Sequence, residues 1–153
     1  MLKVPQVFGA PMVPVLLAVL TACSGLSVRA GVYQTLDEAR RAGAIANGWV
    51  PDGLPESTND LREGHMPDGR RHWGAFSFKS EDAAALRALL GSEITSGTLT
   101  CDPPGRLEFW PRLLLSPVDV ENVKKTGFRL YHGAEGRTFA INWGQGRAYY
   151  WKE

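Results

Sequence analysis

The N-terminal segment limits how much of the chain can form a folded domain. Lys3 is the only charged residue before Arg29, and residues 13–20 are apolar throughout. A short basic start followed by an apolar stretch of this kind is typical of a secretory signal peptide. The stretch is too short for a membrane-spanning helix, which needs about 20 apolar residues. We therefore expect residues 1–22 to be removed and residues 23–153 to form the mature protein.

The end of this segment carries a more specific pattern. Residues 20–23 read Leu-Thr-Ala-Cys, which resembles the lipobox of bacterial lipoproteins. The resemblance implies cleavage between Ala22 and Cys23, with a diacylglycerol on the Cys23 thiol and usually an N-acyl chain, such as palmitate, on its amine. Two or more acyl chains give stable membrane anchoring, whereas one gives only marginal binding. The alternative is an ordinary signal peptide in which the cysteine occurs by chance.

The same resemblance predicts where the protein resides. In Gram-negative lipoproteins an Asp after the cysteine commonly retains the protein in the inner membrane, and this chain has Ser24 there. For a Gram-negative source, the resemblance therefore implies the outer membrane, with the protein facing the periplasm. Residues 23–30 then form a short lipidated tether, and the lipid bilayer is the partner reached through Cys23.

Charge and cysteine content exclude several classes of protein. The chain has 17 Lys and Arg against 16 Asp and Glu, and Lys3 belongs to the predicted signal peptide. A nucleic-acid-binding protein normally has a strong basic excess, so we expect no nucleic-acid partner. Two cysteines exclude a disulfide-dense scaffold and a four-cysteine zinc site. With Cys23 lipidated, Cys101 is a buried thiol, a reactive thiol or half of an intermolecular disulfide.

Turn residues and alternating hydrophobicity predict two groups of strands. Residues 60–66 and 72–78 flank a Pro-Asp-Gly sequence, which is typical of a β-hairpin. Near the C-terminus, residues 128–132, 137–143 and 147–152 are separated by glycine-containing connections, which predicts a three-stranded meander. Together these segments predict an antiparallel sheet of about five strands.

Three short segments carry helix signals. A capping box at residues 35–38 predicts a helix that ends near residue 42. Leucine spacing within residues 80–90 predicts a second helix, and the Ser-Pro pair at 116–117 predicts the start of a third. We therefore expect a single α+β domain over residues 31–153, with the antiparallel sheet and two or three short helices.

The predicted hairpin holds the best candidates for catalysis. His65, Asp68 and His72 lie close to its turn, and imidazole and carboxylate groups are common general acids and bases. They are the candidate site residues of an envelope hydrolase. However, polar residues near a hairpin tip need no catalytic explanation, and a metal needs at least three protein ligands with support from a second layer of hydrogen bonds. We therefore expect no metal and favour a protein without catalytic residues.

Aromatic residues give a second signal. The chain has five tryptophans, and most of them must help to fill the core. Trp49 and Trp110 lie in proline-containing loops, where aromatic side chains often take part in recognition. With His65, these two residues define a candidate binding surface.

A wider pattern surrounds Trp49. Gly-Trp-Val-Pro at 48–51 is followed by Leu-Pro at 54–55, Ser57, Leu61, His65, Trp73 and Phe-Ser-Phe at 76–78. Over residues 31–80 this pattern resembles one that recurs in small bacterial lipoproteins of unknown function. The resemblance implies no activity and so assigns no catalytic residue.

These features favour a lipid-anchored, non-catalytic binding or interaction module in the cell envelope. Its partner would be an envelope protein or a cell-wall ligand, and its only cofactor-like group would be the covalent lipid on Cys23. A periplasmic envelope hydrolase that uses His65, Asp68 and His72 is the alternative. A structural envelope protein that associates with itself is a third hypothesis.

Replacing Cys23 with alanine tests the predicted anchor. Because the thiol is the acylation site, the Cys23→Ala protein should lose radiolabelled acyl chains and leave the membrane fraction. Metabolic labelling and cell fractionation measure both effects. Acyl labelling that persists in the variant would show that the lipobox interpretation is wrong.

Overall fold

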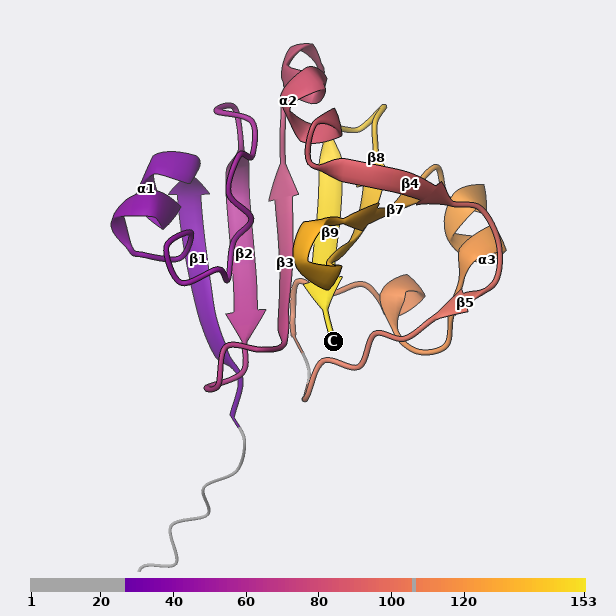
Figure 1. The fold of residues 1–153 in the computed structure, drawn as a ribbon, viewed down its shortest axis with the longest axis horizontal. Helices are drawn as coiled ribbons and strands as arrows, with labels where there is room; N and C mark the ends of the chain where they lie inside the picture. The colour runs from indigo at the N-terminus through magenta and orange to yellow at the C-terminus, as the bar shows by residue number, and fades with distance from the viewer. Residues whose placement is uncertain (1–26, 106) are drawn as a thin grey trace, which may run out of the picture.

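The chain forms a seven-stranded sheet in which all neighbouring strands are antiparallel (Figure 1). The structure, a computed structural model, describes residues 27–105 and 107–153, so Ala22, Cys23 and Ser24 lie outside the described residues. In spatial order the strands are β1 (Arg29–Thr35), β2 (Asn59–His65), β3 (His72–Ser77), β9 (Arg147–Lys152), β8 (Thr138–Asn142), β7 (Arg129–Gly133) and β4 (Leu90–Ile94).

The remaining elements are short. A two-stranded sheet pairs β5 (Thr98–Leu99) with β6 (Val118–Asp119). In the part of the chain that the structure describes, the α-helices are α1 (Leu36–Arg41), α2 (Ala83–Arg87) and α3 (Val120–Lys125), and the 3₁₀ helices are η1 (Ser80–Asp82), η2 (Arg112–Leu114) and η3 (Ala134–Gly136). Within the described residues, no helix is long and apolar enough to span a membrane.

The predicted fold class is wrong. An α+β domain with about five strands was expected, whereas the chain is mostly β, with seven strands in its main sheet. One of the two strands that were not predicted is β4. Leu86, Leu89 and Leu90 have helical spacing, but α2 ends at Arg87, and Leu90 begins a strand that pairs with β7. Long-range pairing therefore overrides the local helical pattern.

The other added strand is β1, which starts at Arg29 and pairs with β2 along its length. The sheet therefore begins inside residues 23–30, the predicted tether. The predicted hairpin and meander are confirmed as β2–β3 and β7–β8–β9. They join through β3 and β9, which pair from His72 opposite Lys152 to Ser77 opposite Arg147.

Helix capping is confirmed at α1 and differs from the prediction at α3. The Thr35 hydroxyl accepts a hydrogen bond from the Glu38 amide (3.2 Å), and the Glu38 carboxylate accepts one from the Gln34 amide (2.7 Å). The predicted third helix starts later than residue 117, because Asp119 caps α3 by accepting from the Asn122 amide (3.1 Å). Residues 118–119 form β6 instead.

Each face of the main sheet carries a hydrophobic core, because alternate strand residues point to opposite faces. On one face, α1 and the loop at residues 42–58 pack against the first core. On the other, the segment at residues 95–128 packs against the second core. Representative members of the first core are Leu36, Ala39, Val50, Leu54, Leu61, Phe76, Phe139 and Tyr150. Those of the second core are Trp73, Cys101, Trp110, Leu114, Val120, Val123, Leu130 and Trp151.

Replacing Gly74 with alanine should destabilise the sheet. Gly74 lies opposite Tyr150 in the β3–β9 pair, and a Cβ atom there would overlap the buried Tyr150 ring. Overpacking a buried site typically costs about 1–3 kcal/mol, so urea unfolding should show a loss of this order.

Gly144→Ala is the matched control. Its Cβ would meet the Asn142 Oδ1 atom at an ordinary distance of 3.7 Å, so its stability should stay close to that of the parent protein. Equal stability of the Gly74→Ala and parent proteins would contradict the packing described here.

Candidate functional site

The structure brings Trp49, His65 and His72 together. The Trp49 indole stacks on the His65 imidazole, with ring centroids 3.7 Å apart and planes 7° from parallel. His65 ends β2 and His72 begins β3, directly opposite it. Asp68 lies in the turn between them, where its carboxylate accepts a hydrogen bond from the Arg70 amide (3.0 Å).

Trp110, the third residue of the predicted binding surface, lies elsewhere. It packs in the second core, on the other side of the sheet from Trp49, which contacts the first core. Its indole N–H donates to the Leu114 carbonyl (3.0 Å). The predicted surface is therefore divided between the two faces of the sheet.

A buried carboxylate lies beneath the Trp49–His65 stack. Glu63, with 1% of its surface exposed, contacts His65 Nδ1 at 2.8 Å, and the Tyr33 hydroxyl lies nearby. Burial raises the pKa of Glu63, and the interactions with His65 and Tyr33 partly offset this rise. The pKa of Tyr33 is also raised, first by burial and then by the nearby Glu63 carboxylate.

Arg137 is the charged residue that links the hairpin to the rest of the site. Its Nε donates to His72 Nε2 (3.1 Å), one Nη donates to the Gly48 carbonyl (2.8 Å), and the other donates to Glu135 (2.7 Å). Because His72 Nε2 accepts, the proton of the neutral ring belongs on Nδ1. That atom faces the Gly69 backbone without a well-formed hydrogen bond.

Tyr150 completes the connection to the centre of the sheet. Its hydroxyl donates to the Trp49 carbonyl (2.9 Å), and complete burial raises its pKa. The carbonyls of Gly48 and Trp49 are thus bound by Arg137, which immediately precedes β8, and by Tyr150, which lies in β9. We refer to the whole set as the polar cluster; its members are Tyr33, Trp49, Glu63, His65, His72, Arg137 and Tyr150.

A hollow lies next to the polar cluster. The Arg137 hollow has a volume of about 260 Å³ and is lined by Ile45, Gly48, Val50, Asp52, Ala134, Glu135 and Arg137. A smaller cavity of about 40 Å³ adjoins it and shares Asp52, Ala134 and Arg137. At the rim of the Arg137 hollow, Glu135 has a φ angle of 59°, in the left-handed region that non-glycine residues seldom adopt. This conformation accompanies the placement of its carboxylate beside the Arg137 guanidinium.

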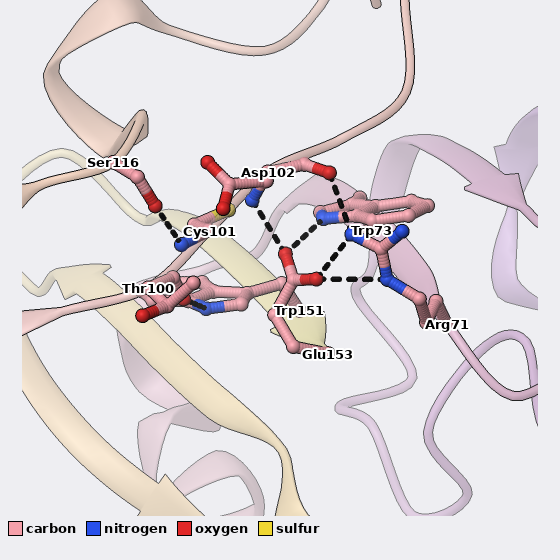
Figure 2. A network of polar contacts seen from close by, with 8 residues as sticks. All are labelled: Arg71, Trp73, Thr100, Cys101, Asp102, Ser116, Trp151 and Glu153. Carbon is pink, nitrogen blue, oxygen red and sulfur yellow. Dashed lines mark hydrogen bonds and ion pairs between the residues drawn. The ribbon is translucent and has the colours of Figure 1, made fainter.

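A second polar network lies at the end of β9 (Figure 2). The Glu153 carboxylate accepts hydrogen bonds from Arg71 Nε (2.8 Å) and the Asp102 amide (2.6 Å), and it also contacts the Trp73 indole. Nearby, Cys101 is a free and fully buried thiol whose pKa is raised by burial. This network fastens the segment around residues 101–102 to the sheet.

The geometry limits the chemistry that the hairpin residues can perform. His65 and His72 are only 5% and 2% exposed, and both rings are in contact with other members of the polar cluster. Within residues 27–105 and 107–153, no three His, Cys, Asp or Glu side chains are arranged to hold a metal ion. Both histidine side chains are thus almost completely shielded from solvent.

Sequence reasoning identified Trp49, His65 and His72 but missed Glu63, Arg137 and Tyr150. For Glu63 a signal was present, because it alternates with Leu61 and His65 on the side of β2 that points into the first core. A charged residue at such a position needs a partner. Arg137 and Tyr150 carry no comparable local signal, because their partners are distant in the sequence.

Comparison with known proteins identifies one similarity. The family model of the YbbD head domain matches residues 31–77. This segment includes Trp49, Glu63, His65 and His72, whereas Arg137 and Tyr150 lie outside it. No curated protein and no solved structure was found to match the chain.

His72 should make the stability of the protein depend on pH. Burial, followed by the charges of Arg137 and Lys152, lowers the His72 pKa from 6.5 to about 4. Between these values the unfolded chain binds a proton that the folded chain does not, so stability falls as the pH falls. The loss amounts to about 3 kcal/mol when the pH reaches the folded pKa.

Urea unfolding of the His72→Gln protein across this pH range tests the effect. Glutamine can still accept from Arg137 but does not titrate, so the variant should lose most of the pH dependence assigned to His72. Glu63, whose raised pKa acts in the opposite sense, is present in both proteins. His132→Gln, at an exposed position, is the control. An unchanged pH profile in His72→Gln would rule out this role.

Proposed function

We propose that the protein is a lipid-anchored lipoprotein of the cell envelope that acts as a non-catalytic binding module. The lipobox-like sequence ending at Cys23 supports the anchor and, for a Gram-negative source, an outer-membrane location facing the periplasm. The Arg137 hollow is the proposed binding surface. An envelope protein or a cell-wall ligand is the proposed partner.

The observation that carries this proposal is the way in which Arg137 is held. A buried guanidinium would be costly without partners, and here His72, the Gly48 carbonyl and Glu135 occupy three of its donors. These contacts fix the wall of the hollow before a partner arrives. Preorganised polar groups reduce the entropy that binding costs.

The lining of the hollow indicates the chemistry of the partner. Asp52 and Glu135 contribute carboxylates, whereas Ile45 and Val50 contribute apolar surface. Carboxylates at the rim favour a partner that offers ammonium or N–H donors. Peptide groups of an envelope protein or of a cell-wall fragment provide such donors.

Binding accounts for the site better than hydrolysis does. His65 and His72 are buried and engaged with Glu63, Trp49 and Arg137. A general base must come within hydrogen-bond reach of the proton that it removes. The hydrophilic groups accessible from the hollow are instead those of Asp52, Glu135 and Arg137.

A pair of isosteric substitutions tests the binding surface. Asp52→Asn with Glu135→Gln should weaken crosslinking to the envelope partner about tenfold or more, since a hydrogen bond to a charged group contributes about 1.5–3 kcal/mol. The measurement is quantitative crosslinking in intact cells, followed by purification of the acylated protein from detergent-solubilised envelopes.

Glu81→Gln with Glu121→Gln removes the same charge from exposed positions away from the hollow and should leave crosslinking unchanged. Equal crosslinking by both double variants would exclude the Arg137 hollow as the binding surface. If the parent protein yields no stoichiometric partner under these conditions, the binding function itself is contradicted.

A further inference from the structure

Two adjoining grooves lie on the side of the sheet opposite the Arg137 hollow. One, of about 400 Å³, runs between β1 and the segment that follows β5, and the other, of about 310 Å³, continues along that segment. Both grooves are lined by Leu107 and Glu108, so they form one continuous surface. We call it the basal surface; its apolar residues include Val28, Val32, Leu107, Phe109, Trp110 and Leu115.

The basal surface exposes large hydrophobic side chains. Val32 is 62% exposed and lines the first groove, and Leu115 is 40% exposed and lines the second. Alternate residues of β1 point the same way, and Val28, Ala30 and Val32 line the same groove. Large hydrophobic side chains that are exposed on one surface in this way mark a site of contact with a protein or a membrane.

The surface is held in place by contacts that do not depend on a partner. The Glu153 network binds the Asp102 amide and Arg71, immediately before the segment that forms the grooves (Figure 2). Further along, the Trp110 indole donates to the Leu114 carbonyl. Val28, Leu107 and Phe109 pack against the second core. The basal surface is therefore preformed.

The position of the basal surface relative to Cys23 identifies its occupant. Five peptide units separate Cys23 from Val28, so an extended chain spans about 18 Å at most. Figure 1 shows the chain entering β1 at the end of the sheet where the β2–β3 turn also lies. Acyl chains on Cys23 would therefore keep Val28, which lines the first groove, within about this distance of the lipid headgroups.

Charges beside the apolar residues fit the same occupant. Arg62 lines the first groove, and Arg112 is exposed and lines the second groove. Guanidinium groups bind phosphate well, whereas Glu108 is the acidic residue that opposes an anionic surface. We infer that the basal surface rests on the lipid bilayer, with Val32 and Leu115 in the interfacial region. This inference rests on the proposed lipid anchor at Cys23.

This orientation leaves the proposed binding surface accessible. The basal surface is built over the second core, whereas Ile45 and Val50 of the Arg137 hollow pack with the first. A protein lying on its basal surface therefore presents the Arg137 hollow away from the headgroups beneath it. The lipid-facing and partner-facing surfaces are then separate.

Site-specific fluorescence tests the inference. An environment-sensitive fluorophore is attached at Val32→Cys or Leu115→Cys, with Glu81→Cys and Gln145→Cys as exposed controls distant from the basal surface. Cys101 is fully buried and should remain unlabelled. The acylated full-length proteins are reconstituted into phosphatidylethanolamine–phosphatidylglycerol vesicles, and circular dichroism verifies their folding.

Labels at positions 32 and 115 should show a blue shift and quenching by headgroup-labelled nitroxide lipid, whereas labels at positions 81 and 145 should behave as in water. If the protein floats with the vesicles but the labels at positions 32 and 115 show no shift, the lipid-facing surface is overturned and the anchor stands. A polypeptide bound to the basal surface would give this result. Shifts at all four positions would also overturn the lipid-facing surface. Failure of the protein to float would instead refute the anchor, and the inferred surface with it.

Discussion

The pairing of β3 with β9 is the constraint on which the rest of the structure depends. It joins an N-terminal hairpin to a C-terminal meander and so turns two small antiparallel units into one sheet. Gly74 permits the Tyr150 ring to lie against β3 at this junction. A side chain at that position would separate the Tyr150 hydroxyl from the Trp49 carbonyl that it binds.

The polar cluster follows from this junction because its members come from both sides of it. Glu63, His65 and His72 belong to the hairpin, whereas Arg137 and Tyr150 belong to or precede strands of the meander. Burying a carboxylate and a guanidinium is favourable only when each has partners. The cluster therefore links the correct assembly of the sheet to the shape of the Arg137 hollow, whose lining includes Gly48 and Arg137.

Local sequence patterns predicted those features that depend on neighbouring residues. The alternation of Phe139 and Ile141 with smaller or polar residues indicated β8, and the capping box indicated α1. Features that depend on distant partners were not predictable in this way. Leu90 fits the helical spacing of Leu86 and Leu89, yet it lies in a strand because it pairs with β7. Trp110 lies in a proline-containing loop, which favoured a role in recognition, yet its side chain packs in the second core. The stacking of Trp49 on His65 requires the path of a loop, which no residue pattern specifies.

The position of β1 at the edge of the sheet has a mechanical consequence. β1 is held by β2 on one side, in register from Arg29 opposite His65 to Thr35 opposite Asn59. A pull on the chain ahead of Arg29, directed along the strand, loads these hydrogen bonds together in shear. A pull directed away from β2 would instead break them one after another from the Arg29 end. The resistance of the protein to extraction through its N-terminus is thus set by the direction of the force as much as by the stability of the fold.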